Sequence, residues 1–370
     1  MSFASRSISA IIAIIVLTLF SFTAAQAQSN VSKPPPPPAA SIQTLDSQSD
    51  FWNQIRHGAQ GKGGQLIQSQ GEDWRLFRNG PLKQYTSYGM LGMVILLALF
   101  FLIRGRIKID HGWSGFTIER FNMLERCGHW ILAVSFIILA LTGLNVTFGK
   151  YVLLPVIGKE AFGTISIGAK YLHNYVAFAF ILGLVWVLVA WIKDNFPRMA
   201  DLKWFLMGGG VLVKGIHPPA HKFNAGQKII FWLVILTGVS ISLSGWALLF
   251  PFETAMFAKT FAFINSVAGT DYPTQLSAIQ EQQYAVTWHN MMAIFMICVI
   301  LAHIYIGSVG MQGAFDAMGS GRVDLNWAKE HHSLWVEKLE REDRLGAERD
   351  ENRDAPDEVD EAKVKAQPAE

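Results

Sequence analysis

The chain has 370 residues, of which 51% are hydrophobic and only 16% are charged, whereas about a quarter of the residues in an average soluble domain are charged. Its two cysteines are too few for a disulfide scaffold or for a cysteine-ligated zinc or iron–sulfur site within the chain. The net charge of +2 combines an acidic end, with 13 acidic and 7 basic side chains in residues 337–370, and a modestly basic remainder, which does not indicate nucleic-acid binding.

Residues 1–27 have the features of a secretory signal peptide. Arg6 precedes an apolar run over residues 8–20, and the sequence Ala-Gln-Ala at 25–27 fits a cleavage site. An uncleaved anchor helix is the alternative, and either one places the following segment outside the cytoplasm. Residues 28–83 are polar and include a run of five prolines, so we expect a periplasmic linker there.

Five long stretches without charged side chains follow the linker. Each is long enough to cross a bilayer core, which takes about 20 residues in a helix. Lipid offers no hydrogen-bond partners to an open backbone, so the spans must be helical, and the continuous apolar runs exclude a barrel. We therefore predict an extra first span at 84–104, and four further spans within Trp130–Gly149, Tyr171–Ile192, Ile229–Phe252 and Gln282–Phe315.

The basic residues of the connecting segments predict the orientation of these spans. Segments 104–128 and 193–228 hold five and six Lys or Arg residues, whereas segments 150–170 and 253–283 hold three and one. The positive-inside rule places the first two segments in the cytoplasm. A cleaved signal peptide leaves the mature N-terminus in the periplasm, and five crossings then bring the charged tail, residues 316–370, into the cytoplasm. The predicted location is the bacterial inner membrane.

Four of the ten histidines lie in or at the ends of the last four spans. Ionisable side chains are costly at membrane depth, so such residues suggest a function. In the predicted topology, two of them lie near the cytoplasmic side and two near the periplasmic side. The cytoplasmic-side pair is His129 and His303, and the periplasmic-side pair is His173 and His289.

The last span carries one histidine of each pair. His289 and His303 are 14 residues apart, which corresponds to about 21 Å of rise and falls about 40° short of four full helical turns. Both rings therefore leave the same face of one helix, and each can meet a partner from another span at its own depth. A haem held between two histidines has no open coordination position and transfers electrons without binding oxygen. The pattern suggests two b-type haems.

Two other readings of these histidines are open. A zinc or di-iron site is disfavoured, because Glu125 is the only carboxylate near a candidate ligand and the Glu-x-x-His motifs of ferritin-like bundles are missing. Proton transport through histidine relays is the stronger rival. It would normally need a buried Asp or Glu, and the spans have none.

The remaining histidines have less to suggest a ligand role. His217 and His221 have helical spacing, but two prolines lie between them, so we expect both in a loop. His331 and His332 follow the last span in a charged segment, where we expect a solvated or partner-facing role. Small residues inside the spans, which permit close approach of a helix or a haem, are Gly143, Gly183, Gly238 and Gly245.

The segment Lys222–Lys228 precedes the fourth span on the predicted cytoplasmic side, at the depth of His129 and His303. An Asn and a Gln at a helix start, with a Gly that permits close backbone approach, can hydrogen-bond the carbonyl groups of a quinone. Asn224 is equally suited to be an ordinary helix N-cap. Both readings stay open.

From about Phe121 to Trp335 the chain resembles the gamma, cytochrome b, subunit of membrane-bound respiratory formate dehydrogenases. The Lys222–Trp232 run is the most specific feature, since Cys-Gly-His-Trp and Leu-His also occur in related di-haem cytochromes, including hydrogenase b subunits. The extension before residue 104 and the acidic tail after 336 depart from the short form of the family. The matching pieces are Glu125-Arg126-Cys127-Gly128-His129-Trp130, Leu172-His173, Lys222–Trp232, Trp288-His289, Ala302-His303-Ile304-Tyr305 and Trp327-Ala328-Lys329-Glu330-His331-His332.

The resemblance implies an all-α, integral membrane, four-helix di-haem cytochrome b bundle over residues 121–315, with one extra N-terminal transmembrane helix. His129 and His303 would ligate the inner haem iron, and His173 and His289 the outer one. A quinone site would use Asn224, Gly226, Gln227 and His303. The implied partners are a periplasmic iron–sulfur beta subunit and a molybdenum or tungsten alpha subunit that oxidises formate.

The expected function is therefore that of a membrane anchor and electron-transfer subunit, which passes electrons from a periplasmic formate dehydrogenase to quinone near the cytoplasmic side. The alternative within the same class is the cytochrome b subunit of a hydrogenase or of another periplasmic oxidoreductase. The alternative from another class is a haem-free, proton-conducting anchor whose histidines only pack or relay protons.

Overall fold

The computed structural model describes residues 69–251 and 253–345. The predicted signal peptide at 1–27, most of the predicted linker and the acidic tail beyond 345 lie outside the described residues. The described residues divide into two compact units, one within 69–85 and 250–287 and the other within 86–249 and 288–345.

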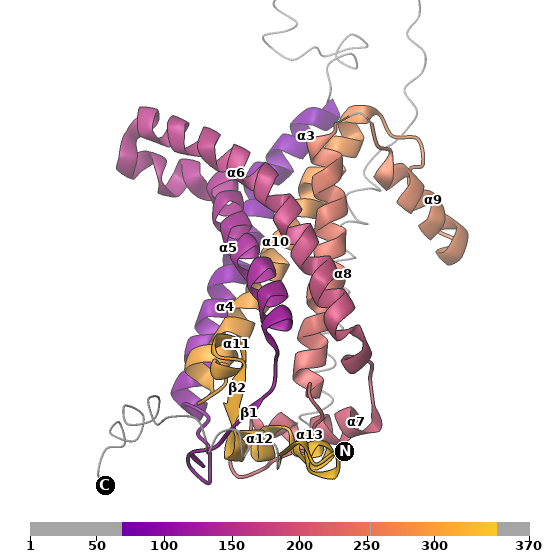
Figure 1. The fold of residues 1–370 in the computed structure, drawn as a ribbon. Helices are drawn as coiled ribbons and strands as arrows, with labels where there is room; N and C mark the ends of the chain where they lie inside the picture. The colour runs from indigo at the N-terminus through magenta and orange to yellow at the C-terminus, as the bar shows by residue number, and fades with distance from the viewer. Residues whose placement is uncertain (1–68, 252, 346–370) are drawn as a thin grey trace, which may run out of the picture. The chain divides into compact units, whose positions relative to one another are not determined.

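Within the described residues, five helical segments are long and apolar enough to cross a membrane, which confirms the predicted spans and the all-α fold. Three are single helices: α5 (Met123–Val152), α8 (Ala225–Leu249) and α10 (Ala278–Tyr305). Helix α6 (Leu154–Trp191) is the longest, and α4 (Lys83–Arg104) is preceded by α3 (Ser69–Phe77) and a π-helical turn, Arg78–Leu82 (Figure 1). A second π-helical turn, Ile306–Gly310, follows α10.

Helices α5 and α6 are longer than the predicted spans, because the segment 150–170, expected to be a loop, is almost entirely helical. The interruption is at Gly158, whose φ of 78° lies in the left-handed region that a residue without a side chain adopts readily. The short connection makes the two helices neighbours. Hydrophobicity locates the part of a helix that lies in lipid, whereas a helix end beyond the lipid carries no such signal.

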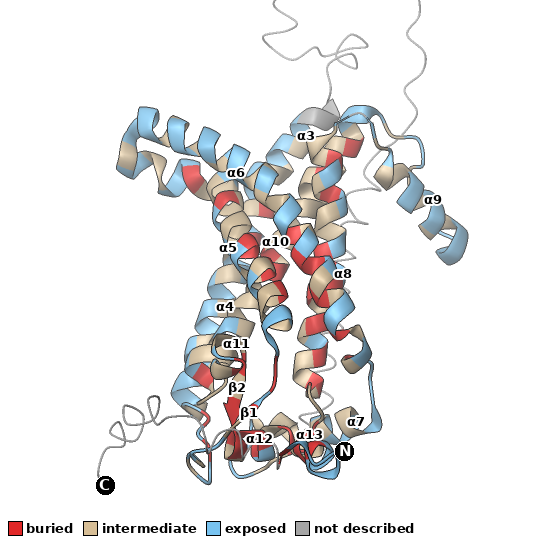
Figure 2. Cartoon of the chain, in the orientation of Figure 1, coloured by how far each residue is buried: buried red, intermediate tan, exposed pale blue. Residues whose placement is uncertain are grey.

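Glycines allow close packing among the helices of the second unit. A Cβ on Gly183 of α6 would come within 2.7 Å of the backbone nitrogen of Leu132 in α5, and one on Gly238 of α8 would come within 2.8 Å of the Leu184 side chain in α6. Buried residues therefore gather on the facing sides of these helices (Figure 2). Helix α4 is mostly exposed, as expected for a span without histidines.

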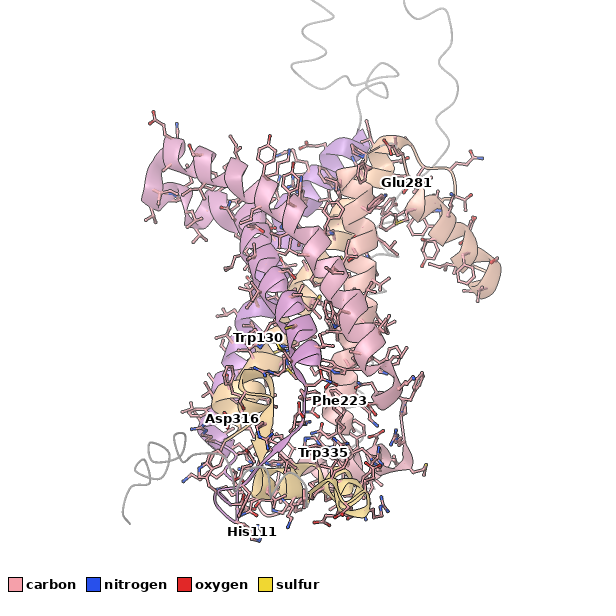
Figure 3. All side chains as sticks on the ribbon, viewed as in Figure 1. His111, Trp130, Phe223, Glu281, Asp316 and Trp335 are labelled. Atoms are coloured by element: carbon pink, nitrogen blue, oxygen red, sulfur yellow. The ribbon has the colours of Figure 1, made fainter. Side chains whose placement is uncertain are left out.

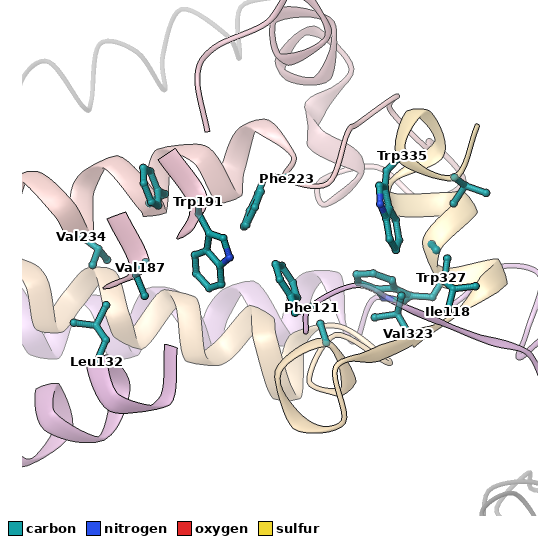
Figure 4. Close-up of a cluster of buried hydrophobic side chains, with 14 of the residues drawn as sticks. Ile118, Phe121, Leu132, Val187, Trp191, Phe223, Val234, Val323, Trp327 and Trp335 are labelled. Carbon is teal, nitrogen blue, oxygen red and sulfur yellow. The ribbon is translucent and has the colours of Figure 1, made fainter. Parts of the chain in front are cut away.

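Short elements form a folded layer at one end of the second unit. Strands β1 (Thr117–Glu119) and β2 (Arg322–Asp324) pair antiparallel, with Ile118 opposite Val323. The other elements are helices α7 (Met199–Leu206), α11 (Asp316–Gly319), α12 (Leu325–His331) and α13 (Ser333–Arg341), with 3-10 turns at Ile192–Asp194 and Gly208–Gly210. Figure 4 shows Trp327 and Trp335 in its core, near Phe121.

The first part of the predicted charged tail, residues 316–345, is folded as part of this layer. Val323 and Ala328 are fully buried, and Trp327 is 2% exposed. Asp324 caps α12, since its side chain accepts hydrogen bonds from the backbone nitrogens of Asn326 and Trp327. The outer faces of these helices carry many charged residues, and only a few apolar residues pack inward. The sequence of this segment therefore resembles that of a charged tail.

The first unit contains a helix that the sequence analysis did not predict, α9 (Met256–Ala268). Its start is fixed by Glu281 of α10, which is 6% exposed and accepts hydrogen bonds from the backbone nitrogens of Phe257 and Ala258. A carboxylate at that position satisfies free N–H groups and complements the helix dipole. Its partner residues are distant in sequence, so local patterns do not reveal this cap.

Candidate functional site

The four span histidines meet as the two predicted pairs, both within the second unit. The ring centres of His173 on α6 and His289 on α10 are 6.2 Å apart, and those of His129 on α5 and His303 on α10 are also 6.2 Å apart. The rings within each pair are inclined by 64° and 60°. Both histidines of α10 therefore leave one face of the helix, as their 14-residue spacing predicts.

The outer pair is held by hydroxyl groups. Oγ1 of Thr142 lies 2.8 Å from Nδ1 of His173, and Oγ of Ser244 lies 3.1 Å from Nδ1 of His289. Each hydroxyl also donates to a backbone carbonyl of its own helix, that of Ile138 or Leu139 for Thr142 and that of Ile241 for Ser244. A hydroxyl that donates to a carbonyl accepts from the ring, so the proton is on Nδ1 and the lone pair is on Nε2.

The residue after each hydroxyl is a glycine that lies against the same ring. A Cβ on Gly143 would be 3.4 Å from Cε1 of His173, and a Cβ on Gly245 would be 3.3 Å from Cε1 of His289. Any longer side chain would displace the imidazole. Helices α5 and α8 thus hold the two rings in the same way, with a hydroxyl residue followed by glycine.

The geometry fits a metal bound between the rings of each pair. A bond of about 2 Å from metal to nitrogen on each side, and about 1.1 Å from each ligating nitrogen to its ring centre, place the ring centres about 6.2 Å apart. The fixed Nδ1 protons of the outer pair also leave Nε2 as the ligating atom. The chemistry and spacing of the donors therefore fit a haem iron that the two histidines of a pair would hold.

The inner pair lies among aromatic side chains. The ring centre of His129 is 5.3 Å from that of Trp130 and 6.3 Å from that of Trp191. The indole nitrogen of Trp191 donates to Glu125, which also pairs with Lys222 at 2.6 Å. Nδ1 of His129 is buried and has no hydrogen-bond partner among the residues that the structure describes. The inner pair thus lacks the hydroxyl contacts that orient the outer pair.

The segment Lys222–Lys228 leads into α8 and contains its first residues, close to the inner pair. The Phe223 ring is 5.4 Å from that of Trp191, which in turn contacts His129. Asn224 and Gln227 form a reciprocal cap: Oδ1 of Asn224 accepts from the Gln227 backbone nitrogen at 2.9 Å, and Oε1 of Gln227 accepts from that of Asn224 at 3.1 Å. The N-cap reading is therefore correct, and the side-chain NH₂ groups of both residues stay outside the cap.

Gly226 lies beside a tryptophan of α7. A Cβ on it would come within 3.0 Å of the Trp204 ring and 3.4 Å of Oδ1 of Asn224. The glycine therefore allows α7 to approach the start of α8. The structure brings Asn224, Gly226 and Gln227 together, and their use by a quinone stays a prediction.

The structure confirms one of the two predictions for the other histidines and corrects the second. His217 and His221 lie in a loop, as expected. His331 and His332 are not solvated: His332 is 1% exposed and Nε2 of each ring is buried. They pack against Trp327, at 5.2 and 5.3 Å between ring centres, because the surrounding segment folds instead of forming a tail.

The sequence analysis missed the roles of Thr142 and Ser244. Each is a polar residue followed by glycine inside a span, which is a signal that could have found them. The sequence indicates that Gly143 and Gly245 are sites of close approach, but it does not show that each lies against a histidine ring.

Comparisons with known proteins place the chain in a family. The family described as prokaryotic cytochrome b561 matches residues 120–321. The cytochrome b556(Fdn) subunit of the nitrate-inducible formate dehydrogenase of Escherichia coli strain K12 is 27% identical over 226 residues, covering 60% of this chain and 92% of that protein.

Two further relatives are also formate dehydrogenase subunits by name. The cytochrome b556(fdo) subunit of Escherichia coli strain K12 is 28% identical over 232 residues, covering 63% of this chain and 98% of that protein. The cytochrome b556 subunit of Haemophilus influenzae is 26% identical over 220 residues, covering 59% and 82% respectively. The matched family region contains all four paired histidines and ends before His331.

Proposed function

The chain belongs to the prokaryotic cytochrome b561 family, whose match spans more than half of its length, and on that premise we propose that it is the di-haem membrane subunit of a formate dehydrogenase. Membership of a cytochrome b family implies that the chain binds haem b. We propose, beyond family membership, that it binds two haems, that it serves a formate dehydrogenase and that electrons move from the periplasmic side to the cytoplasmic side. The observation that carries it is the equal 6.2 Å separation of rings in two histidine pairs.

The proposal assigns the four histidines to two haem b groups. His173 and His289 hold the outer haem iron, and His129 and His303 hold the inner one. Bound in this way, the haems supply one-electron transfer without an open position for oxygen. The protein supplies the orientation of the rings: Thr142 and Ser244 keep the Nδ1 protons of the outer pair in place, so that Nε2 faces the iron.

The proposed electron acceptor is a quinone near the start of α8. Trp191 and Phe223 connect the inner pair with this helix start through ring contacts of 6.3 and 5.4 Å. The NH₂ groups of Asn224 and Gln227 are the donors available to quinone carbonyl oxygens, since the amide oxygens are used in the helix cap. Gly226 and His303 complete the proposed site.

The proposed partners are an iron–sulfur beta subunit and a molybdenum or tungsten alpha subunit on the periplasmic side. Formate would be oxidised there to carbon dioxide, one proton and two electrons. Quinone would take up these two electrons, with two protons from the cytoplasm, to become quinol. Electrons move inward and protons are consumed inside, so the reaction would generate a membrane potential. The names of three relatives as formate dehydrogenase subunits support this choice of partner.

The purified complex tests the proposal. Formate should reduce haem in the wild type, and added quinone should reoxidise it. Replacing His303 by Leu should abolish quinone reduction, while a Thr164→Val complex, changed at an exposed residue of α6, should behave as the wild type. Equal quinone reduction by the His303→Leu complex would contradict the proposal. If a hydrogenase subunit is purified together with the tagged chain, the alternative function as a hydrogenase cytochrome b subunit is supported instead.

A further inference from the structure

A buried group of polar side chains surrounds the indole ring of Trp327, away from the histidine pairs. The guanidinium of Arg120 lies 5.1 Å from the ring centre, and the rings of His331 and His332 lie 5.2 and 5.3 Å from it. Arg120 is 4% exposed, Trp327 2% and His332 1%. Such a concentration of polar side chains is expensive to bury unless each group has a hydrogen-bond partner.

Four nitrogens of this group are buried without a partner among the residues that the structure describes: Nε of Arg120, Nε1 of Trp327, and Nε2 of His331 and His332. Buried polar atoms are nearly always hydrogen-bonded, and those without a protein partner usually bind ordered water. Unpartnered atoms on residues that surround one ring therefore indicate a shared, hydrated polar site.

The outer end of this site opens to solvent. Nε2 of His217 lies 3.1 Å from the exposed carboxylate of Asp110, and the His217 ring centre is 6.4 Å from that of His331. Beside them, the exposed His111 contacts Glu330 at 2.8 Å. In Figure 3, His111 marks this end of the unit, and Trp335, Phe223 and Trp130 follow in turn toward the helices.

The inner end of the site reaches the proposed quinone position. The Arg120 guanidinium donates to Oε1 of Gln227 at 3.1 Å and to the backbone oxygen of Lys222 at 2.7 Å. Arg120 thus contacts both the hydrated polar site and the start of α8. The contributing segments, 104–128, 193–228 and the end after α10, are those that the sequence places on the cytoplasmic side.

We propose that these residues form the route by which protons reach the quinone from the cytoplasm. The route runs from Asp110 and His217 through His331 to water held by Arg120, and then to the quinone beside Gln227. This inference rests on the proposed function, which places quinone reduction at the start of α8. Each quinone takes up two electrons through the chain and two protons through the route, so charge and atoms balance.

The chemistry of the side chains suits this role. Burial lowers the pKa of His331 to about 4, so its ring is neutral at pH 7 and can accept a proton on one nitrogen while it releases one from the other. Burial and, after it, the neighbouring Arg120 lower the pKa of His332 well below its ordinary value. Arg120 stays charged, with a pKa lowered by burial to about 9, and orients water as a donor. The titratable and charged groups around His331 are Glu330, His217, Arg120, Asp110 and His332.

The test uses the complete complex and follows each half of the reaction separately. Haem is first reduced by formate or dithionite, and its reoxidation by added quinone is then timed in H₂O and D₂O. The variants are His331→Gln inside the route, His217→Gln at its outer end and His111→Gln as control. The control residue is an exposed histidine of the same layer that lies outside the route.

We expect haem content and the rate of haem reduction to stay at the wild-type level in all three variants. Reoxidation should slow by about 100-fold in His331→Gln, the lower end of the range for loss of a positioned proton-transfer group. His217→Gln should slow it less, and His111→Gln should leave it unchanged. The solvent isotope effect should rise in both slow variants, and their rates should fall with rising pH, because proton delivery then limits the reaction.

Wild-type reoxidation in His331→Gln with intact haem would overturn the proton route and leave the proposed function standing. A slow variant without an increased isotope effect would also overturn it, since that pattern indicates a structural role. If the His331→Gln complex fails to assemble, the reoxidation rate and isotope effect of the His217→Gln complex test the proton route in the same way. Failure of quinone to reoxidise wild-type haem would instead contradict the proposed function.

Discussion

The hydroxyl of Thr142 lies 2.8 Å from Nδ1 of His173, across the contact between α5 and α6. The same arrangement recurs between Ser244 and His289, at 3.1 Å across the contact between α8 and α10. Each outer histidine is therefore oriented by a neighbouring helix. The equivalent nitrogen of His129 in the inner pair has no such partner among the described residues.

Removing one of these hydroxyls should weaken the outer site alone. Thr142→Val keeps the volume and removes the hydrogen bond to His173, and loss of such an outer partner typically lowers metal affinity by about 10- to 100-fold. We expect the outer haem to be lost on dilution in detergent while the inner haem stays. Haem per chain after gel filtration measures this, with Thr164→Val on the exposed surface as control. Full retention of both haems would count against the proposed orienting role.

A bulky residue at Gly143 or Gly245, which lie against the rings of the outer pair, should weaken the outer site more than loss of a hydroxyl does. The 3.4 Å left beside His173 accommodates one methyl group at most, so Gly143→Leu should displace the imidazole. We expect about one haem per chain and a single remaining redox transition. Gly163→Leu is the matched control, because nothing lies within 4 Å of a Cβ at that position. Two haems in the Gly143→Leu protein would show that the ring does not depend on this close approach.

The buried ion pair between Lys228 and Asp201 should stabilise the start of α8. The Nζ–Oδ2 distance is 2.7 Å, and Lys228 is 4% exposed. Asp201→Asn leaves the ammonium without its counter-ion, which we expect to cost about 3–5 kcal/mol of unfolding free energy. The double change Lys228→Met with Asp201→Leu should be close to the wild type. Thermal unfolding in detergent measures the stability of the single and the double variant, with Lys203→Met, at an exposed residue of α7, as control. Equal melting temperatures of the single and double variants would contradict a stabilising ion pair.

Acid should destabilise the layer that contains His331. Its folded-state pKa is about 4, whereas an unfolded histidine titrates near 6.5, so the unfolded chain binds more protons between these values. The stability present above pH 6.5 is therefore lost as pH falls toward 4, by about 2 kcal/mol at pH 5. His331→Leu should show a smaller loss of thermal stability between pH 7 and pH 5 than the wild type. An equal loss in both would contradict the low pKa.

The sequence predicts the membrane helices and the histidine pairs well, because both depend on simple geometry. A charge-free run of sufficient length must be a helix in lipid, and a 14-residue spacing returns a side chain to nearly the same face. Together with the orientation that the positive-inside rule gives, these rules place His289 and His303 on α10 opposite His173 and His129.

The remaining features depend on tertiary contacts that have no local signature. Thr142 and Ser244 are ordinary small polar residues until another helix brings a ring to them. Helix α9 begins where Glu281, from a later helix, caps it. The layer around Trp327 combines segments that are about 200 residues apart in sequence, which is why His331 and His332 were expected in solvent.

We propose that the two histidine pairs hold two haems, and this assignment is open to a spectroscopic test. The most direct measurement is the dithionite-reduced minus oxidised spectrum of the purified protein with haem quantitation, for the wild type, His173→Ala and His303→Ala. We expect two haems per chain in the wild type and a loss of absorbance in each variant, from the outer site in one and the inner site in the other. One haem in the wild type, or an unchanged spectrum in either variant, would contradict it.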